Sequence, residues 1–532
     1  MYDILLKNGI IVDGTGSAPF VSDIAVTDGK IVKISANIRG DAKEIIDICN
    51  QYVTPGFIDI HRHSDASILR ENFGEIELRQ GITTTLNGNC GLSIVPCPDN
   101  RKDMIFKYLK PIIGTVNIDS NFQTFSEYYE MLRHKSIPIN FGSNIGNGTV
   151  RMAVKGFEKG NLTQEQIEKA HAFILDGIEN GAFGVSMGVV YMPENCYDLN
   201  GFIEVLQPIK NTKIPIITHI RGEGDLLLKS IEEVILIAKS LNVPLHISHF
   251  KCVGKHNWGH LLEKAIELLD KARSDGMKIT CDVYPYTAGS TQLVQLLPPE
   301  FLEGGMEETT NRLKDSNQRK KIKDILEKKQ TKFENLLASV GWESIMITSL
   351  YKEENQKYIG MRVTEIAQLQ NKDPYDCAFD LLVEENCDVS MVNFIVCDKD
   401  IETILKYEHS CIISDSIYPD GGIPHPRLYG TFTKVLCDYV RDRKVLTLPE
   451  AIRKITFLPS KIMNIVNKGL LKEGFDADIT VFELKKLVNG SSYVNPKVLG
   501  KGFDYVIVNG IIAVKNDVLM KNNSGKIIMR GL

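Results

Sequence analysis

The 532-residue sequence predicts an α/β fold, in which a (β/α)8 barrel over residues 56–466 is joined to a small β-sandwich built from residues 1–55 and 467–532. Two observations predict this fold. Short apolar runs alternate with amphipathic helical stretches through the middle of the chain, which is typical of a parallel sheet with crossover helices. Both ends of the chain are instead rich in short strands without helices between them.

The strands at the two ends are bounded by hairpin signals. Residues 1–55 contain apolar runs that are interrupted at Asn8-Gly9 and at Asp28-Gly29, and residues 467–532 contain a third such pair at Asn509-Gly510. Asn-Gly and Asp-Gly pairs between apolar runs are the strongest short hairpin signals, so we expect a turn at each pair. Two β-rich ends around a long middle predict one small sandwich assembled from both termini.

The middle of the chain offers eight strand candidates, the number that a closed barrel needs. They are residues 56–63, 82–91, 138–148, 182–188, 214–221, 244–251, 278–286 and 411–416. An open, doubly wound sheet is the alternative, but no Gly-x-Gly-x-x-Gly turn follows the first strand, where that fold would carry it. The charged stretch around residues 300–350 predicts a solvated helical insertion into the barrel.

Composition restricts the class of protein and its partners. The chain is 43% hydrophobic and 24% charged with a net charge of −5, which argues against nucleic acid or an anionic membrane as the main partner. No apolar stretch approaches the roughly 20 residues that span a bilayer. The first residues lack a basic segment before their apolar run, so we expect no signal peptide. Eleven scattered cysteines do not resemble a disulfide framework and favour a cytoplasmic location.

Residues with metal-binding side chains stand at the ends of five strand candidates. His61 and His63 end the first one, and side chains at i and i+2 of a strand face the same way. An isolated His-x-His pair is also typical of two unrelated solvated or half-buried histidines. However, Cys90, His219, His249 and Asp415 occupy the same end of four further candidates. Barrel active sites lie at this end, so we expect all of these side chains to form one site.

The types of donor atom indicate a metal and a reaction. Imidazoles, one thiolate and one carboxylate suit Zn²⁺, which accepts mixed ligands and keeps a position open for water. Zinc lowers the pKa of bound water towards ~7. Asp415 is the natural general base, because a carboxylate beside the metal can take the proton of the water and pass it to a leaving amine. The pattern therefore predicts metal-assisted hydrolysis.

Eight segments resemble the amidohydrolase superfamily, in its N-acyl-D-amino-acid deacylase (D-aminoacylase) family. They are PGFIDIHRHSD, QGITTTLNGNCGLSIVP, GAFGVSMGVVYMP, THIRGEGD, PLHISHFKCVGKHNWG, DVYPYTAGST, HPRLYGTF and GLLKEGFDADITVF. They cover nearly the whole chain in the order of the family. Dihydroorotases and hydantoinases, which are similar barrels, bridge two metals with a carboxylated lysine on the fourth strand. Residues 182–188 contain no lysine, whereas Cys90 stands where the D-aminoacylase family uses a cysteine.

The resemblance implies a metal arrangement. Cys90, His219 and His249 would hold one tightly bound zinc ion. A second, weaker site would be formed by the remaining donors together with Cys90 as a bridge, and these donors are His61, His63 and Asp415. The family is thought to need mainly the first metal.

The resemblance also implies how a substrate is bound. Four residues match positions that bind the α-carboxylate of an N-acyl-D-amino acid, namely Lys251, Tyr284, Ser290 and Arg427. Tyr191 would donate to the amide carbonyl oxygen, with an aromatic lid over the barrel mouth as the alternative role. Leu297 and Val190 would line the pocket for the side chain, and an apolar wall favours apolar D-amino acids. Glu223 is expected to support the site rather than to bind metal.

Three positions depart from the family pattern. Asn147 stands where relatives usually have histidine, and Arg62 stands where threonine is common. The segment from Asp415 to Arg427 differs from the usual sequence, which affects the loop that presents Asp415.

The expected function is hydrolysis of a small-molecule N-acyl-D-amino acid to a carboxylate and a free D-amino acid. Alternatives on the same scaffold are a dipeptidase for substrates with a carboxyl-terminal D-residue and a cyclic-amide hydrolase. A non-catalytic scaffold protein is the alternative from another class. Every ligand position is filled, which argues against the scaffold protein, and metal analysis of protein purified without added zinc would discriminate. The sequence does not predict the oligomeric state.

Overall fold

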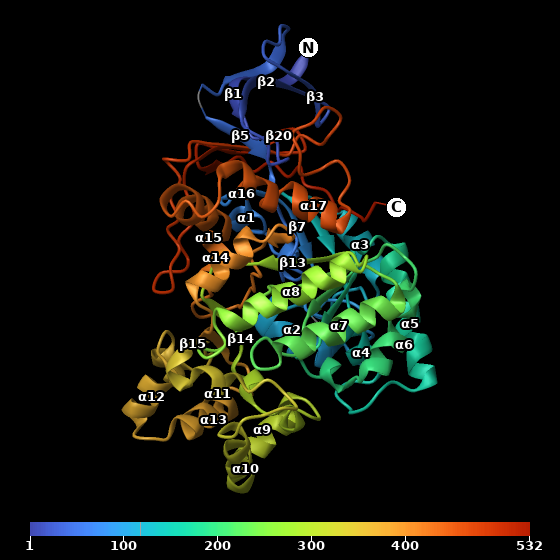
Figure 1. Ribbon diagram of the computed structural model, residues 1–532, viewed down its shortest axis with the longest axis vertical. Helices are drawn as coiled ribbons and strands as arrows, with labels where there is room; N and C mark the ends of the chain where they lie inside the picture. The colour runs from blue at the N-terminus through green and yellow to red at the C-terminus, as the bar shows by residue number, and fades with distance from the viewer. Residues whose placement is uncertain (50, 118, 532) are drawn as a thin grey trace.

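A computed structural model describes residues 1–49, 51–117 and 119–531. Three parts follow one another along its long axis (Figure 1). A sheet that holds the amino-terminal strands lies at one end, the barrel with its outer helices lies in the middle, and a helical region in yellow lies at the other end. The described residues contain no helix that is both long and apolar enough to cross a membrane.

The barrel contains the eight strands that the sequence predicts. Its strands are β6 (Phe57–Asp59), β7 (Ile82–Asn87), β8 (Asn140–Ser143) with its continuation β9 (Ile145–Gly146), β10 (Val185–Gly188), β11 (Ile216–His219), β12 (Leu245–Ile247), β13 (Ile279–Val283) and β17 (Ser410–Ile412). Paired neighbours run parallel. A parallel bridge between Arg62 and Ser416 joins the first strand to the last, so the ring is closed.

Helices follow the barrel strands and bury one face against them. They are α1 (Glu75–Leu78), α2 (Lys102–Ile113), α3 (Phe125–Arg133), α4 (Asn147–Val154), α5 (Gln164–Glu179), α6 (Leu199–Val205), α7 (Leu227–Leu241), α8 (His260–Ser274), α14 (Asp398–Lys406), α15 (Arg427–Lys434), α16 (Leu448–Ile455) and α17 (Phe457–Met463). The hydroxyl of Thr163 caps α5, and Gln166 completes a capping box there. The helix then buries Ala170, Ile174 and Gly177 at helical spacing.

Strands from both ends of the chain form one nine-stranded sheet. Its order is β21 (Val518–Leu519), β20 (Ile511–Lys515), β19 (Phe503–Val508), β18 (Ile479–Phe482), β5 (Tyr52–Pro55), β1 (Tyr2–Ile11), β2 (Phe20–Thr27) and β3 (Lys30–Ser35), with β4 (Ala42–Asp47) beside β1. The predicted turns at Asp28-Gly29 and Asn509-Gly510 are confirmed, because they join β2 to β3 and β19 to β20. The domain boundaries near residues 55 and 467 stay a prediction.

The turn expected at Asn8-Gly9 is wrong, because β1 continues through this pair as a bulged strand. Asn8 has a φ of 59°, and its N–H donates to Asp23 Oδ1 at 2.9 Å. A Cβ on Gly9 would lie 2.6 Å from Cγ2 of Val53 on β5. The pair therefore permits a bulge and a close approach between two strands, instead of reversing the chain.

The insertion between β13 and β17 is longer than residues 300–350 and is not purely helical. It contains the antiparallel sheet β14 (Ala288–Gln292), β16 (Ser390–Phe394) and β15 (Ile345–Ser349), in that order. Its helices are α9 (Met306–Lys314), α10 (Ser316–Leu326), α11 (Leu336–Val340), α12 (Val363–Gln370) and α13 (Pro374–Glu384). Long segments separate these strands in the sequence, so no short hairpin turn indicates their pairing.

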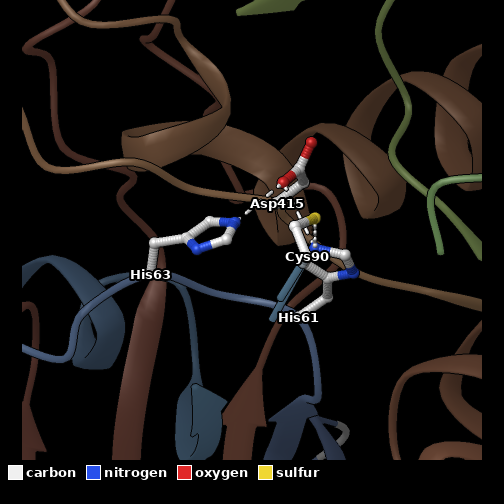
Figure 2. A group of neighbouring side chains, drawn as sticks. All are labelled: His61, His63, Cys90 and Asp415. Atoms are coloured by element: carbon white, nitrogen blue, oxygen red, sulfur yellow. Dashed lines mark hydrogen bonds and ion pairs between the residues drawn. The ribbon is translucent and has the colours of Figure 1, made fainter. Parts of the chain in front are cut away.

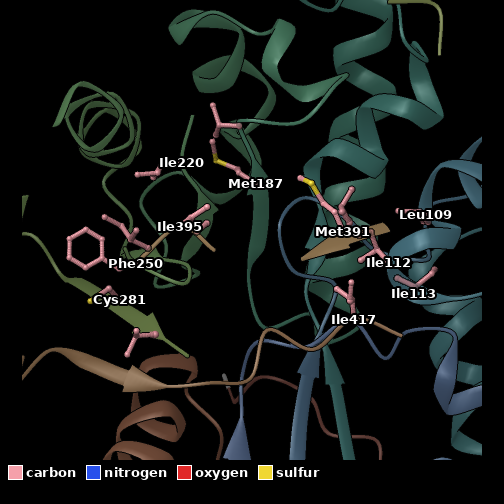
Figure 3. Packing of buried hydrophobic residues seen from close by; sticks show 14 of the residues in the cluster. Leu109, Ile112, Ile113, Met187, Ile220, Phe250, Cys281, Met391, Ile395 and Ile417 are labelled. Atoms are coloured by element: carbon pink, nitrogen blue, oxygen red, sulfur yellow. The ribbon is translucent and has the colours of Figure 1, made fainter. Parts of the chain in front are cut away.

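The insertion packs onto the barrel through buried side chains of β16 and the residues that follow it. Figure 3 shows Met391 beside Ile112 of α2 and close to Ile417, whereas Ile395 lies nearer to Phe250. All five side chains are buried. The insertion therefore covers the carboxyl-terminal ends of the barrel strands, where the candidate ligands lie.

Candidate metal centre and active site

The ends of the barrel strands bring the predicted ligands together in two groups that share Cys90. One ligand atom from each member of a group lies within 4.8 Å of the others. The first group contains Cys90, His219 and His249, and the second contains His61, His63, Cys90 and Asp415. Figure 2 shows the side chains of the second group converging, with His61 and His63 after β6, Cys90 after β7 and Asp415 after β17. The structure thus brings together the six side chains that the sequence analysis selects, and their role as metal ligands stays a prediction.

Cys90 is held in a tight turn after β7. Its φ is 53°, and the Ser186 hydroxyl accepts from the N–H of Gly91 at 3.1 Å and donates to the carbonyl of Gly88 at 2.6 Å. Asp415 and His249 also have positive φ values, of 52° and 35°. Such strained backbone persists at functional sites only where the surrounding structure determines it.

The electrostatics of the cluster favour a thiolate. Burial alone would raise the pKa of the Cys90 thiol. The positive charges of His61 and His249, with hydrogen bonds from His219 and His249, outweigh burial and hold that pKa well below its usual value. The sulfur lies 3.3 Å from Nε2 of His61 and 3.5 Å from Nε2 of His249. A thiolate is the form of cysteine that binds metal.

Asp415 faces both histidines of the first strand end. Its Oδ1 lies 3.4 Å from Nε2 of His61 and 3.5 Å from Nε2 of His63. Its other oxygen forms an ion pair with Nη1 of Arg427 at 2.7 Å. Burial would raise the pKa of this carboxyl, but the Arg427 charge and the hydrogen bond with His63 hold it well below its usual value. Asp415 is therefore ionised.

Two carboxylates contact His61 and His249 at Nδ1, the ring nitrogen that faces away from Cys90. Asp282 on β13 lies 3.4 Å from Nδ1 of His61 and 2.9 Å from Nε2 of His246, and it accepts the backbone N–H of His249. Glu223 lies 3.1 Å from Nδ1 of His249, while Nε2 of that ring faces Cys90. Outer carboxylates of this kind fix the ring orientation of metal-binding histidines. Glu223 thus contacts a candidate ligand, and its supporting role stays a prediction.

The residues present fit a divalent metal. Among the described residues, the buried Nδ1 atom of His219 has no hydrogen-bond partner. Buried polar atoms without partners are rare in proteins, and a metal ion would satisfy this atom together with the clustered donors. Sulfur and imidazole donors suit zinc and related transition metals better than they suit Mg²⁺ or Ca²⁺.

A cavity of about 120 Å³ opens directly onto these donors. Its walls contain all of the predicted substrate residues except Leu297. Those present are Val190, Tyr191, Lys251, Tyr284, Ser290 and Arg427. The insertion contributes Leu336, Met391, Asn393 and Ile395 to the same walls. The substrate residues and the candidate ligands therefore border one space.

Lys251 and Arg427 both have protein partners at this cavity. Nζ of Lys251 lies 2.6 Å from Oε1 of Glu223 and 2.8 Å from Nδ1 of His249. If Nε2 of His249 binds metal, its Nδ1 carries a proton and Glu223 is the acceptor, because the ammonium of Lys251 cannot accept. Arg427 donates from Nη2 to the carbonyl of Ser290 at 3.2 Å, and its buried Nε has no partner among the described residues. The N–H at Nε of Arg427 is therefore not used by the described protein residues.

Leu297 does not line this cavity. It borders a neighbouring cavity of about 390 Å³, whose walls also include Leu302 and Phe333. The two cavities share Val190, Gln295 and Glu334. Val190 thus borders both the space beside the ligands and a larger space with apolar and charged walls, and Leu297 borders only the latter.

Asn147, which stands where relatives usually have histidine, forms a buried hydrogen bond with Glu194. It begins α4 and donates from Nδ2 to Oε1 of Glu194 at 2.7 Å. The other oxygen of Glu194 accepts the N–H of Gly188 at 2.7 Å, close to Gly91. Burial raises the pKa of Glu194 to about 7. Sequence reasoning missed Glu194.

Asp282 was also missed, although a signal was available. It stands in the same strand candidate as Tyr284 and is a carboxylate near a strand end, as Asp415 is. Gln295 and Asn393 line the cavity from the insertion and carry no comparable signal.

Comparisons with known proteins agree with this geometry. Residues 363–514 match a model of the Amidohydrolase family. D-aminoacylase from Alcaligenes xylosoxydans xylosoxydans is 28% identical over 99% of this chain and 98% of that protein. N-acyl-D-glutamate deacylase from the same organism is 25% identical over 99% of this chain and 96% of that protein.

A solved structure has the same fold over its full length. It is a D-aminoacylase structure that addresses the functional role of a binuclear metal centre, with one-metal activation and second-metal attenuation. It superimposes with a TM-score of 0.84 at 27% identity, and the match covers 100% of both chains. The barrel, the clustered donors and these similarities agree: the chain is a metal-dependent amidohydrolase, and over its whole length it is similar to D-aminoacylases.

Proposed function

We propose that this protein uses zinc to hydrolyse N-acyl-D-amino acids to a carboxylate and a free D-amino acid, with a preference for apolar side chains. The observation that carries the proposal is the cavity in which Cys90, His219 and His249 face the same space as Arg427. A single small substrate in this cavity could then reach both a metal site for amide cleavage and a cation for its free carboxylate. The relatives named for D-aminoacylase and N-acyl-D-glutamate deacylase support this substrate class.

Cys90, His219 and His249 would hold the tightly bound zinc, and His61, His63 and Asp415 would complete a weaker second site with Cys90. Zinc supplies a water of lowered pKa and polarises the amide carbonyl. The family member with one-metal activation and second-metal attenuation supports unequal roles for the two sites. Asp282 and Glu223 keep His61 and His249 turned towards the donors.

Asp415 would move the proton. Its ionised carboxylate borders the cavity and faces His61 and His63, so it can accept a proton from the attacking water. The same carboxyl would pass that proton to the departing amide nitrogen. Tyr191 borders the same space, and burial, with the charge of Cys90, keeps the pKa of its phenol well above the usual value. Tyr191 stays protonated and can donate to the amide oxygen.

Arg427 would bind the α-carboxylate through its free Nε, with Ser290, Tyr284 and Lys251 around it. Its guanidinium stands 5.0 Å from the ring centroid of Tyr284, which fixes its plane. A charged N–H donor binds a carboxylate more strongly than a neutral amide, so a substrate with a free carboxylate should be preferred.

Arg427→Met is expected to cost roughly 2–4 kcal/mol in kcat/KM for an N-acyl-D-amino acid, as for the loss of a buried charge partner. The matched substrate is its carboxamide, which should be poor for the wild type and no worse for the variant. Steady-state kinetics on both substrates provide the measurement. Equal losses on the charged and the neutral substrate would show that Arg427 is structural, through its ion pair with Asp415.

The cavity beyond Val190 would receive the side chain of the substrate. Its apolar residues Leu297, Leu302 and Phe333 offer no partner for a second carboxylate, whose desolvation would cost several kcal/mol. The same walls contain Lys159, Arg221 and Lys332, of which Lys159 and Arg221 are already paired with Glu303 and Glu233. An apolar side chain gains ~0.8 kcal/mol for each buried CH₂. N-acetyl-D-leucine, D-methionine and D-phenylalanine should therefore have higher kcat/KM than N-acetyl-D-glutamate or D-aspartate.

Leu297→Arg is expected to shift this preference towards the acidic substrates, because it adds an unpaired cation beside Leu302 and Phe333 in this cavity. The measurement is kcat/KM across the same five substrates. Leu302→Arg tests whether any arginine in this cavity has the same effect. A wild-type preference for D-glutamate, or an unchanged order in Leu297→Arg, would remove Leu297 from the side-chain pocket.

A substrate panel tests the proposed reaction itself. It contains N-acetyl- and N-formyl-D-leucine, their L-enantiomers, a dipeptide with a carboxyl-terminal D-residue, and a hydantoin. Turnover of the D-acyl compounds alone is expected. Faster turnover of the dipeptide or the hydantoin would instead establish one of the alternative activities.

A further inference from the structure

Arg62 lies between the two histidines of the first strand end, and its side chain is completely buried. The guanidinium contacts Asp59 through Nη1 at 2.9 Å and Glu77 through Nη2 at 2.9 Å. It also donates from Nε to the hydroxyl of Tyr418 at 3.1 Å and from Nη1 to the hydroxyl of Ser414 at 3.3 Å. One buried cation therefore joins four side chains from three segments, and we call these five residues the Arg62 cluster.

The Arg62 cluster surrounds the segment that carries Asp415. Ser414 precedes Asp415, and its N–H and hydroxyl donate to the two oxygens of Asp59, at 3.1 and 2.5 Å. Tyr418 follows three residues after Asp415, and its hydroxyl donates to Glu77 while accepting from Arg62. The cluster thus holds the chain on both sides of Asp415.

The backbone of Asp415 needs such support. Its φ of 52° lies in the left-handed region, which is strained for a residue other than glycine and persists only where the surrounding structure imposes it. The backbone itself makes two contacts with the opposite strand end. The N–H of Asp415 donates to the carbonyl of His61, and the N–H of His63 donates to the carbonyl of Ser416, each at 2.9 Å.

We infer that Arg62 and Tyr418 are positioning residues for Asp415, since they fix the segment from Ser414 to Tyr418 against the strand end that carries His61 and His63. Neither side chain is among the walls of the substrate cavity, so both act through Asp415 and not on the substrate. Arg62 and the Asp415–Arg427 loop are also two places where the sequence departs from the family pattern, and here they contact each other. The inference rests on the proposed role of Asp415.

Tyr418→Phe is the sharpest test, because it removes one hydroxyl and leaves the Arg62 charge with Asp59 and Glu77. We expect kcat on N-acetyl-D-leucine to fall by about 10- to 100-fold, the cost of a misplacement on the order of 1 Å, with KM changed less than about twofold. Tyr407→Phe is the matched control. Tyr407 precedes β17, whereas Asp415 follows it, and the Tyr407 hydroxyl donates to the Asp270 carboxylate at 2.5 Å. Loss of this hydroxyl should leave kcat unchanged.

A double variant distinguishes positioning from a general loss of stability. In an Asp415→Asn background, Tyr418→Phe should cause little further loss of kcat, because its effect passes through a carboxylate that is already gone. Arg62→Lys keeps the charge but lacks the planar fork, so it should lower kcat in the same direction. Multiplicative losses in the double variant, or an unchanged kcat in Tyr418→Phe, would overturn the inference.

A crystal structure of Tyr418→Phe provides a readout that needs no substrate. The Asp415 carboxylate is expected to move relative to His61 and His63, while Cys90, His219 and His249 stay in place. An unmoved Asp415 in the variant would contradict the inference, whatever the wild-type protein hydrolyses. Conversely, a displaced Asp415 in a protein that fails to cleave N-acetyl-D-leucine would overturn the proposed substrate and leave the positioning role intact.

Discussion

Asp415→Asn is expected to lower kcat on N-acetyl-D-leucine by about 10²–10⁴-fold, the range that a general acid–base group contributes. An amide cannot accept the proton of the attacking water, although it preserves the size of the side chain. The tight zinc should remain, because Cys90, His219 and His249 do not depend on Asp415. Metal analysis and steady-state kinetics of the same preparation measure both quantities.

Asp420→Asn is the matched control for Asp415→Asn. Asp420 lies in the same loop but pairs with Arg70 and with the hydroxyl of Thr115, away from the cavity. Its replacement should leave kcat unchanged. Near-normal turnover in Asp415→Asn would remove Asp415 from the mechanism, and an equal loss in both variants would attribute the effect to the loop.

Cys90→Ala is expected to abolish tight zinc binding and all metal-dependent activity. Cys90 is the one sulfur donor of both ligand groups and the residue that they share. Its thiol is held in the charged form by His61 and His249. Measurement of zinc content after dialysis against a chelator would test this expectation.

Cys97→Ala provides the comparison for Cys90→Ala. Cys97 is buried seven residues further on, its sulfur donates to the carbonyl of Phe122, and burial raises the pKa of its thiol to about 12. Loss of this neutral thiol should leave the zinc in place. Full zinc content in Cys90→Ala would show that the assignment of the site is wrong.

The barrel and its donors could be predicted because their signals are periodic and local. Each strand is a short apolar run before a polar end, and parallel strands place those ends at one rim. His61 and Asp415 are far apart in sequence, yet strand order alone makes them neighbours. The Asp28-Gly29 turn was predicted for a similar reason, since two residues with positive φ specify a tight hairpin.

Features that depend on distant contacts were not predictable in the same way. Asn8-Gly9 has the same turn chemistry as Asp28-Gly29, but pairing with β2 and the proximity of Val53 make it a bulge. The sheet of the insertion pairs β14 with β16 across about a hundred residues, and no local pattern encodes that pairing. Leu297 was placed by its position in a motif, whereas the packing of the insertion assigns it to the neighbouring cavity.

The central claim is zinc-dependent cleavage of an N-acyl-D-amino acid, and one measurement tests it most directly. Protein stripped of metal by a chelator is assayed with N-acetyl-D-leucine and N-acetyl-L-leucine, before and after addition of one equivalent of zinc. We predict no turnover without zinc and restored turnover of the D-compound alone with zinc. Undiminished turnover by the stripped protein, or turnover of the L-compound at a comparable rate, would contradict the claim.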